Sequence, residues 1–538
     1  MKHMKQKLKN GIVLLLAAAL LTGCAGAGGG ELSSDESASS AAVTAEATEI
    51  AQPSLASPVT VSEVRSSGEQ PGAEEQLVTL SDSEGSVRVT EAGTYRLSGT
   101  LTNGQIVVEA AEDAKVKLIL DGVSIRCEGS AAICAITADK LVLATAQGSS
   151  NLLESAGTFL QTDETKVDAA VFAKCDLTLS GDGELGIRCD SGHGVVSKDD
   201  LKIKSGTIAI DASGQGLSGK DSVTVEDGLL TIVSGTDGIQ SEHDDTEKGN
   251  IEIQGGSIYI QSGTDGMEAS GSVFLSGGEL TIDCEDDGVH AENELTISEG
   301  LIRVTKCCEG LEAQIITIDG GEIRIFATDD GLNAAGGSDS SETWGPWGGD
   351  PFQTDSGAAL TINGGFLVIN AEGDGLDSNG QLVVNGGVVY VSGPTNGGNG
   401  AIDYGVEAVI NGGTVIAAGS AGMAEGFGSS STQGSMLLNV GNQSGGTTVT
   451  VTDESGAVLA SYTPEKSYQT VVVSAPGMVL GGTYTVTAGS FSETVTLDSI
   501  AYGSGMGGFG GFGGPGDFGG FGGPGSQDGG PGGPGRRP

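Results

Sequence analysis

Acidic and amide side chains recur at two positions of a short repeated phrase, and together they could bind cations. The phrase reads Thr-Asp-Gly-Met-Glu-Ala at Thr264 to Ala269, and similar six-residue segments precede and follow it. The first of the two positions holds Asp237, Asp265, Asp287, Glu309, Asp330 and Asp374. The second holds Gln240, Glu268, His290, Glu312, Asn333, Asp377 and Asp403. Oxygen-rich groups of this kind suit Ca²⁺, which takes about 6 to 8 oxygen ligands in a flexible geometry.

The copies of this phrase are regularly spaced, which would bring their side chains together in a stacked repeat. Gly266, Gly288 and Gly310 are 22 residues apart, and Gly331 follows after 21. Two longer gaps in the series, of 28 and 44 residues, contain insertions. A fixed period of this length is typical of proteins in which each repeat packs only against its neighbours.

Short runs between the phrases alternate apolar and polar residues, which is the pattern of half-buried strands. Glycine pairs such as Gly320-Gly321 separate these runs, where a turn needs a positive φ or a close backbone approach. Three short strands and three turns fit into about 22 residues, and stacking such units at ~4.8 Å gives one continuous core. The sequence therefore predicts an all-β fold, a parallel β-helix over residues 77–430.

Alternation also predicts which side chains form the core of this repeat. One inward-facing set is Ile258, Ile260, Leu280, Ile282, Ile302, Val304, Ile323, Ile325, Leu367, Ile369, Val389 and Val391. A second set follows the phrase glycine and consists of Ile239, Met267, Val289, Leu311, Leu332, Leu376 and Ile402. The residue after each member of the second set should then point outward.

Stacking in this manner places like charges on top of one another. Unit charges about 4 Å apart repel by ~1 kcal/mol in water and by more near a protein surface. Cations between the coils would offset this repulsion, so we expect Ca²⁺ on the series, with Asp265, Glu268 and Asp287 among its ligands. The alternative is that Asp-Gly simply favours β-turns and that the carboxylates are solvated.

The two ends of the chain differ from the repeat. Residues 1–24 contain a lysine-rich start, a short apolar segment and Leu21-Thr22-Gly23-Cys24, which resembles a bacterial lipobox. We expect lipid attachment at Cys24 on the extracellular face of the bacterial cell membrane, with the lipid as the sole membrane attachment. The alternative is an ordinary secretory signal.

Composition distinguishes three further segments. Residues 25–76 are rich in alanine, serine, glutamate and glycine and predict a disordered tether, and residues 501–538 predict a disordered tail rich in glycine, phenylalanine and proline. Residues 431–500 lack the glycine phrase but alternate threonine and valine, which predicts a small C-terminal antiparallel β cap.

The charge balance limits the partners. With 71 acidic and 25 basic residues the formal charge is −46, which argues against nucleic-acid binding through phosphates. We expect a monomer whose partners are cations, neutral surfaces or acidic polymers bridged by cations.

Seven cysteines remain besides Cys24 and cannot all pair, so buried free thiols are expected. His193, His243 and His290 fall on different positions of the repeat, so we expect no metal site from them and interpret them as surface residues.

Aromatic residues offer flat faces on which sugars could stack. Trp344 and Trp347 are the chain's two tryptophans, and they share a Gly/Ser-rich insertion with Phe352. We also expect Tyr390 and Tyr404 to contact carbohydrate. The alternative for the insertion is a loop that folds back and covers the core.

A catalytic function requires groups that this sequence does not clearly provide. Eliminative cleavage of a uronate needs a base beside the metal, but Ile325 to Glu465 contains no lysine or arginine. Arg303 and Arg324 are the stacked basic pair nearest to the series, and no pair of carboxylates is set apart as in a glycoside hydrolase. We expect no enzymatic activity; a calcium-dependent polysaccharide lyase is the alternative.

Several segments together resemble a known family. They are GPTNGGNGAIDY at Gly393 to Tyr404, GDGLDSNG at Gly373 to Gly380, SYQTVVVSAPG at Ser467 to Gly477 and the glycine-rich tail. They look like the carbohydrate-binding domain-containing lipoproteins of clostridia and relatives, and the resemblance covers about Leu77 to Ile500.

The resemblance implies a right-handed, pectate-lyase-like parallel β-helix that binds plant cell-wall or acidic polysaccharide such as polygalacturonate. It also implies a Ca²⁺-bearing stretch, which we place on Asp330, Asn333, Asp374, Asp377 and Asp403. A structural or adhesive surface protein, whose calcium only rigidifies the solenoid, is the alternative function.

Overall fold

The computed structural model describes residues 59–60, 75–82, 85–161, 165–335 and 357–503. These residues form strands, turns and bends and contain no helix, so the predicted all-β class is confirmed. The described residues therefore contain no helix that could cross a membrane. Within the described residues, thirty-nine strands join in one long sheet and four form a second sheet. Cys24, the tryptophan-bearing insertion and most of the predicted tether and tail lie outside the described residues.

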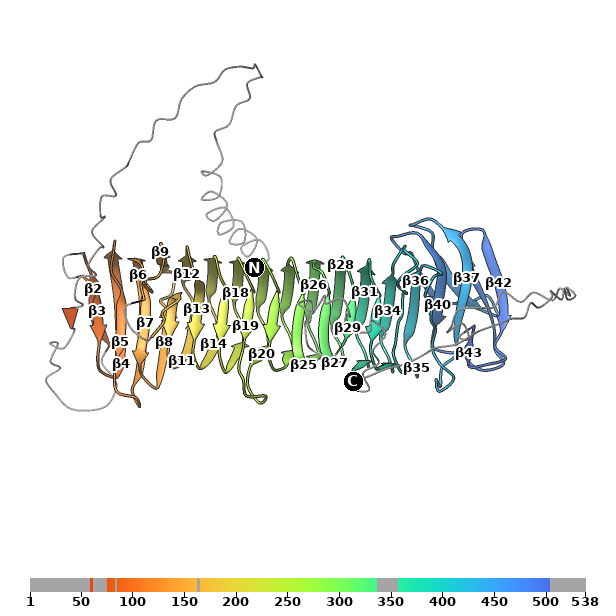
Figure 1. Cartoon of the computed structure of the whole chain (residues 1–538), viewed down its shortest axis with the longest axis horizontal. Coiled ribbons are helices and arrows are strands. Elements are labelled where there is room, and N and C mark those ends of the chain that lie inside the picture. Colours follow the sequence, from red (N-terminus) through yellow and green to blue (C-terminus); the bar gives the residue numbers. More distant parts are fainter. Residues whose placement is uncertain (1–58, 61–74, 83–84, 162–164, 336–356, 504–538) are drawn as a thin grey trace, which may run out of the picture. The chain divides into compact units, whose positions relative to one another are not determined.

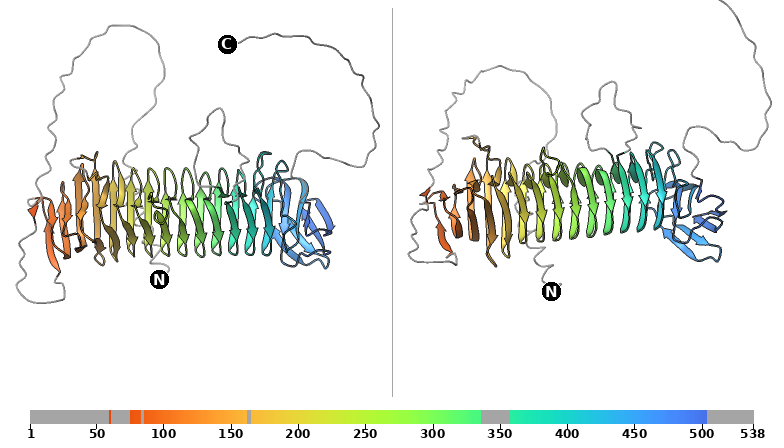
Figure 2. Two further views of the ribbon diagram at one scale, coloured as in Figure 1. Left: turned by 60° about the horizontal axis from the view of Figure 1, so that its bottom comes forward. Right: turned by 90° about the horizontal axis from the view of Figure 1, so that it is seen from below.

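Successive strands follow one another along the long axis of the described region, as Figures 1 and 2 show. Through most of the long sheet, each strand pairs in parallel with the equivalent strand about 22 residues later, for example β15 with β18 and β18 with β21. We call three successive strands a coil, and each column of equivalent strands a wall. Each coil therefore lies directly on the previous one, with the parallel pairing predicted from the repeat.

The first wall consists of β1 (Val59–Thr60), β3 (Val87–Val89), β5 (Ile106–Glu109), β7 (Ile133–Thr137), β10 (Ala169–Ala173), β13 (His193–Ser197), β16 (Leu217–Gly219), β19 (Ile239–Ser241), β22 (Met267–Ala269), the beginnings of β25 (Val289–Ile297) and β27 (Leu311–Ile318), β29 (Leu332–Ala334) and β32 (Leu376–Ser378).

The second wall consists of β2 (Gln76–Leu80), β4 (Gly93–Leu101), β6 (Lys115–Glu128), β8 (Lys140–Thr145), β11 (Asp176–Gly181), β14 (Asp200–Ile203), β17 (Ser222–Val225), β20 (Asn250–Ile253), β23 (Val273–Leu275), the ends of β25 and β27, β30 (Ala359–Ile362), β33 (Gln381–Val384) and β35 (Glu407–Ile410).

The third wall consists of the end of β6, β9 (Ser150–Ala156), β12 (Glu184–Cys189), β15 (Thr207–Ala212), β18 (Leu229–Ser234), β21 (Ser257–Gln261), β24 (Glu279–Asp283), β26 (Leu301–Lys306), β28 (Glu322–Ala327), β31 (Phe366–Ala371), β34 (Val388–Ser392) and β36 (Thr414–Gly419).

The core runs through the coils as one continuous cluster. Both predicted inward-facing sets are buried in it, and the second set, on the first wall, is completely inaccessible. Each of these side chains packs against the side chains at the same position in the preceding and following coils. The alternation within each strand determines which residues point inward, and the period of about 22 residues stacks them from coil to coil.

The phrase glycines allow the coils to approach closely. A Cβ on Gly310 would lie 2.2 Å from the carbonyl oxygen of Gly331 and 2.5 Å from Cγ2 of Ile325. The glycine pairs combine two constraints: Gly321 has a φ of +91°, whereas a Cβ on its neighbour Gly320 would lie 2.3 Å from the Ser298 carbonyl oxygen. Close approach and left-handed backbone therefore both fix where glycine is needed.

The C-terminal strands change the direction of pairing. β36 is antiparallel to β40 (Tyr468–Ser474), which is antiparallel to β37 (Ser435–Gln443), and β37 pairs with β43 (Ala501–Tyr502). A separate antiparallel sheet is built from β38 (Val449–Asp453), β39 (Val458–Tyr462), β41 (Thr483–Ala488) and β42 (Phe491–Thr496). The segment predicted as a separate cap thus contributes strands to both sheets and occupies an edge of the long sheet.

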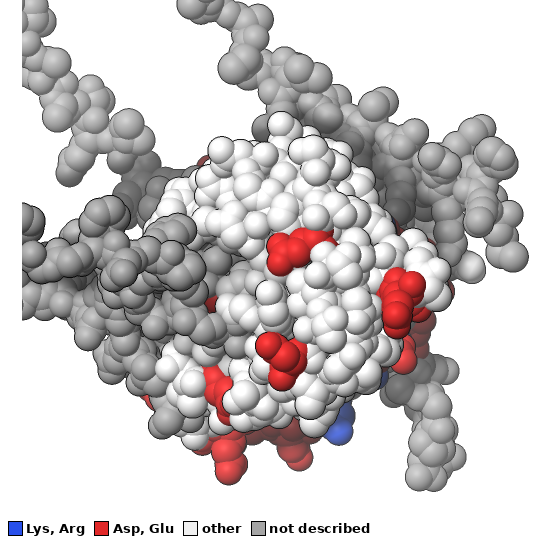
Figure 3. Space-filling model, turned by 90° about the vertical axis from the view of Figure 1, so that its right-hand side faces the viewer, with Lys and Arg blue, Asp and Glu red and all other residues white. Residues whose placement is uncertain are grey.

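The surface at this end is mostly uncharged. Figure 3 shows isolated acidic side chains separated by wide areas of other residues. The acidic side chains that the repeat stacks lie along the coils and not on this end face.

Candidate functional site

The parallel register stacks the outward side chains of the first wall in the predicted order. We define the acidic row as the side chains at the two phrase positions from β19 to β32. At the second position, Gln240 lies opposite Glu268, followed in register by His290, Glu312, Asn333 and Asp377. A bridge between Leu376 and Ile402 continues the stack to Asp403. The acidic row is thus built from strands more than 130 residues apart in the chain.

Several turn carboxylates of the row link their coil to the next. The backbone N–H of Asp287 donates to Oδ1 of Asp265 at 2.8 Å, and that of Glu309 donates to Oδ1 of Asp287 at 3.2 Å. The N–H of Asp374 donates to Oδ1 of Asp330 at 2.5 Å. These bonds explain why the phrase keeps an acidic residue before its glycine: the carboxylate accepts an N–H that the turn would otherwise leave unsatisfied.

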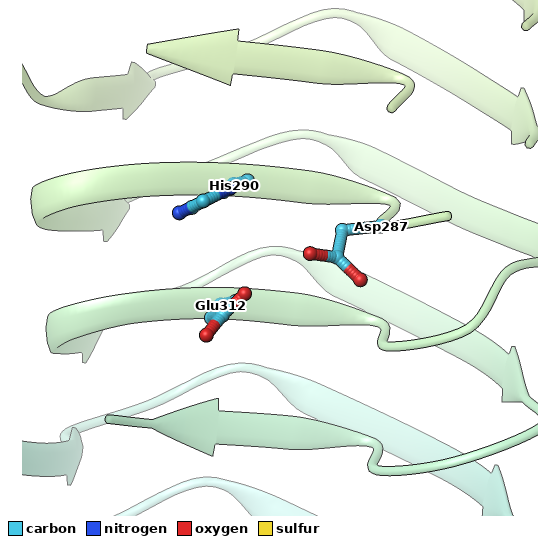
Figure 4. Close-up of side chains that lie close together, drawn as sticks. All are labelled: Asp287, His290 and Glu312. Carbon is cyan, nitrogen blue, oxygen red and sulfur yellow. The ribbon is translucent and has the colours of Figure 1, made fainter. Parts of the chain in front are cut away.

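Carboxylates meet in four places along the row. Asp330, Asp374 and Asp377 each place one oxygen within 4.8 Å of the others, and so do Asp237, Asp265 and Glu268. The same limit holds for Asp265, Asp286 and Asp287, and for one ligand atom each of Asp287, His290 and Glu312. Figure 4 shows this last group, with His290 and Glu312 on successive coils and Asp287 at the turn. Distances of this order would let one cation bind three protein groups.

Burial raises the pKa of several row carboxyls. It raises the pKa of Asp330 to about 9, helped by the charges of Asp374 and Asp377. It also raises the pKa of Asp377 to about 7 and that of Asp374 to about 6. Upstream, burial and Glu312 raise the pKa of Asp287 to about 9, and burial with the Asp237 charge raises that of Glu268 to about 8. The groups ionise with difficulty because they are shielded and close together, and a bound cation would remove that penalty.

Asn333 of the row and Glu425, which lies outside the repeat, add contacts at the downstream end. Asn333 donates from Nδ2 to Oε2 of Glu309 at 2.8 Å. Glu425 follows β36, and burial together with the charges of Asp403 and Asp374 raises its pKa to about 7. Glu425 lies in a loop without the repeated phrase, so no signal in the sequence indicates its position beside the row.

Two interpretations of the sequence need correction here. His290 is only 5% exposed, so its assignment as a surface residue is wrong. The second-position side chains leave the core, but His290, Glu312 and Asn333 are buried instead of solvated. The reason is the register: each lies between the corresponding side chains of the neighbouring coils, which cover it.

The structure places the two candidate tyrosines in packed surroundings. Tyr390 lies face to face with Tyr462, with ring centroids 4.6 Å apart and planes 5° apart, and edge-on to Phe366 at 6.0 Å. Tyr404 follows Asp403, and its hydroxyl donates to the Gly426 carbonyl at 3.0 Å. One face of Tyr390 is therefore covered. Trp344, Trp347 and Phe352 lie outside the described residues.

A polar cleft of about 400 Å³ adjoins the upstream end of the row. Its lining consists of His193, Ser197, Lys198, Gln215, Ser218, Lys220, Gln240, Glu242, His243 and Asp244. Gln240 belongs to both features, because it lines the cleft and donates to Oε2 of Glu268 at 2.7 Å. The cleft therefore brings two lysines beside a surface that is otherwise rich in carboxylates.

The raised pKa values predict a pH-dependent stability without metal. Asp330 and Asp287 hold their protons up to about pH 9 in the folded chain but lose them near pH 4 when unfolded. The folded state then binds more protons than the unfolded state, so stability should fall as the pH rises through this interval. In chelator, we expect a lower melting temperature at pH 8.5 than at pH 5.5, measured by circular dichroism. A melting temperature that rises over the same interval would contradict the shielding of these carboxyls.

Comparison with known proteins shows that part of the described region matches a family model. Residues 83–342 match the family model described as carbohydrate-binding domain-containing protein. The match covers the strands from β3 to β29. The matched region includes the upstream row up to Asp330 and Asn333, whereas Asp374, Asp377, Asp403 and Glu425 follow it.

Two individual proteins are similar to parts of the chain. A carbohydrate-binding domain-containing protein of Acetivibrio thermocellus is 35% identical over 135 residues, which is 25% of this chain and 47% of that protein. The chain thus spans about half the length of this curated relative. A solved polysaccharide lyase-like protein from C. thermocellum, a gadolinium derivative, is 31% identical, with 41% of this chain and 95% of that chain covered and a TM-score of 0.40.

Proposed function

We propose that this protein is a right-handed parallel β-helix that binds an acidic polysaccharide, such as polygalacturonate, through Ca²⁺ held on the acidic row. The observation that carries the proposal is the group of Asp330, Asp374 and Asp377, whose carboxylate oxygens lie within 4.8 Å of one another. The carbohydrate-binding family match supports the class of ligand.

Electrostatics favours a calcium bridge over direct contact. A chain with a formal charge of −46 repels an acidic polymer, and the sequence from Ile325 to Glu465 provides no lysine or arginine to offset this. Ca²⁺ accepts about 6 to 8 oxygen ligands, so three protein carboxylates leave positions for a uronate carboxylate and hydroxyls. The polymer would then bind to the metal and not to the bare row.

The polar cleft would extend this surface upstream. Lys198 and Lys220 line the cleft beside Gln240 of the row, and Nζ of Lys198 lies 3.8 Å from an Asp168 carboxylate oxygen. An acidic sugar residue on the same polymer could pair with these lysines while its neighbours contact Ca²⁺, because cleft and row are continuous along the first wall. Binding at several linked subsites multiplies the effective affinity.

Removing both lysines should therefore weaken polymer binding. We expect Lys198→Ala/Lys220→Ala to lower the affinity for polygalacturonate roughly tenfold and to reduce its salt dependence, because two charge-assisted contacts are lost. Lys202→Ala is the matched control, since Lys202 lies on the second wall and pairs with Glu226 at 3.2 Å. Equal losses in both variants would show that the cleft has no special role.

A structural role is the second candidate, and one observation favours it. Row carboxylates accept N–H groups from the next coil, so metal at these positions would also tie coils together. Under that function, Ca²⁺ would raise stability while leaving sugar affinity unaffected.

The arginines considered for lyase chemistry lie on the third wall, where Arg303 pairs with Glu279 at 3.3 Å and Arg324 with Glu322 at 3.0 Å. Neither lies on the wall that carries the row.

The proposed setting is the extracellular face of the bacterial membrane, with lipid attached at Cys24. Labelling with a radioactive fatty acid tests this directly, since Cys24→Ala should abolish incorporation and release the protein to the medium.

Affinity electrophoresis in gels containing polygalacturonate tests the function. Calcium-dependent retardation, without any rise in the ultraviolet absorbance of unsaturated products, is the expected result. A rise in absorbance would make the protein a lyase, and the absence of both signals would favour the structural role.

A further inference from the structure

We propose that Asp287, His290 and Glu312 form a separate site for a divalent transition-metal ion such as Zn²⁺. This site is distinct from the Ca²⁺ position proposed at Asp330, Asp374 and Asp377 and does not depend on sugar binding. It would make the row a surface with two classes of metal, one bound by oxygen alone and one bound by oxygen and nitrogen.

The three side chains converge from two successive coils. Asp287 lies at the turn before β25, His290 lies in β25 and Glu312 lies in β27, directly opposite His290 in the register. One ligand atom of each lies within 4.8 Å of the others, as Figure 4 illustrates. All three are buried, with exposed fractions of 4%, 5% and 8% respectively. The positions are therefore fixed by strand pairing and shielded from bulk water.

An unsatisfied nitrogen indicates that the group is incomplete without a ligand. Nε2 of His290 is buried and has no hydrogen-bond partner among the described residues. Leaving a buried polar atom unpaired costs ~1 to 3 kcal/mol, and folded proteins seldom tolerate it without a reason. A neutral imidazole carries its proton on one ring nitrogen and offers a lone pair to a metal from the other.

The donor set distinguishes this site from its neighbours. Every other second-position member of the row offers oxygen as its metal ligand, whereas His290 offers nitrogen. Ca²⁺ prefers oxygen throughout, and imidazole suits Zn²⁺ and other transition ions. One histidine and two carboxylates supply three ligands, and water can fill the remaining position of a tetrahedral ion.

Nearby thiols are the natural competitors for Zn²⁺, but they are poorly suited to bind it. Cys284, Cys307 and Cys308 lie on the same coils. Burial raises the pKa of Cys284 and Cys308 to about 12 and that of Cys307 further. The sulfurs of Cys284 and Cys307 also donate to backbone carbonyls. These hydrogen bonds engage two of the three sulfurs, and the Cys308→Ser variant described below tests the third.

Isothermal titration of the full chain with Zn²⁺, in 1 mM Ca²⁺ and without polysaccharide, tests the proposal. We expect one site of micromolar or tighter affinity that is weakened at least tenfold in His290→Gln and in Glu312→Gln. His243→Gln and Cys308→Ser are the matched controls and should leave this affinity within about twofold. Circular dichroism establishes that each variant is folded.

The Co²⁺ spectrum of the unaltered protein provides a test that needs no variant. We expect visible d–d bands without the near-ultraviolet charge-transfer band that thiolate ligands produce. A thiolate band, loss of binding in Cys308→Ser, or displacement of Zn²⁺ by 1 mM Ca²⁺ would each overturn the proposal, and so would the absence of any Zn²⁺ site. None of these results would bear on Ca²⁺-dependent sugar binding, which is measured without Zn²⁺.

Discussion

Replacing Gly310 with alanine should destabilise the protein by about 3 kcal/mol or more. The new Cβ would lie 2.2 Å from the Gly331 carbonyl oxygen, which is backbone and cannot rotate away. The two coils would have to separate, and both the strand hydrogen bonds and the core contact with Ile325 would suffer. Forced overpacking in a well-packed interior costs about 1 to 3 kcal/mol, and shifts of backbone cost more.

Denaturant unfolding followed by circular dichroism measures this effect. Gly397→Ala is the matched control, because the nearest atom to its new Cβ would be Gly422 Cα at 3.9 Å. It should change stability by no more than about 0.5 kcal/mol. If both substitutions have the same effect, close approach of the coils does not explain the repeated glycine.

Removing two charges from the downstream row should abolish most calcium binding. We expect Asp330→Asn/Asp377→Asn to weaken Ca²⁺ binding at least about 100-fold, since ligand charge strongly determines the affinity of such sites. The same change should raise the stability of the metal-free protein, because the two carboxyls repel each other and Asp374 when ionised. Opposite effects on metal-free stability and metal affinity are the signature of a binding site.

Thermal unfolding with and without Ca²⁺ gives both quantities. Ca²⁺ at 100 times its dissociation constant stabilises the unaltered protein by ~2.7 kcal/mol, and the variant should lose this gain. Asp319→Asn is the matched control, as Asp319 lies outside the row and accepts a hydrogen bond from Asn363 at 2.8 Å. An unchanged calcium response in the double variant would show that these row carboxylates do not bind the calcium.

The repeat made most of the fold predictable from the sequence. The inward-facing residues follow from alternation, and the 22-residue spacing by itself places Glu268, His290 and Glu312 in one column. The positions of Asp330, Asp374 and Asp377 follow in the same way, although the two phrases are 44 residues apart and an insertion lies between them. Periodicity works here because each coil contacts mainly its neighbours, so local pattern and tertiary contact coincide.

Other features of the site depend on contacts between residues that the sequence repeat does not relate to one another. Glu425 reaches the row from a loop, and Tyr462 covers Tyr390 from β39, a strand of the C-terminal sheet. The burial of His290 escapes the sequence because a polar residue at an outward position is normally solvated, whereas stacking between two glutamates encloses it. The cleft at Lys198 and Lys220 likewise joins residues whose side chains meet only after coiling.

The most direct test of the central claim is a crystal structure with Ca²⁺ and an oligogalacturonide, using anomalous scattering to identify calcium. We expect an anomalous peak between Asp330, Asp374 and Asp377, with a uronate carboxylate of the sugar completing its coordination. A sugar bound elsewhere, with no calcium in this group, would contradict the account.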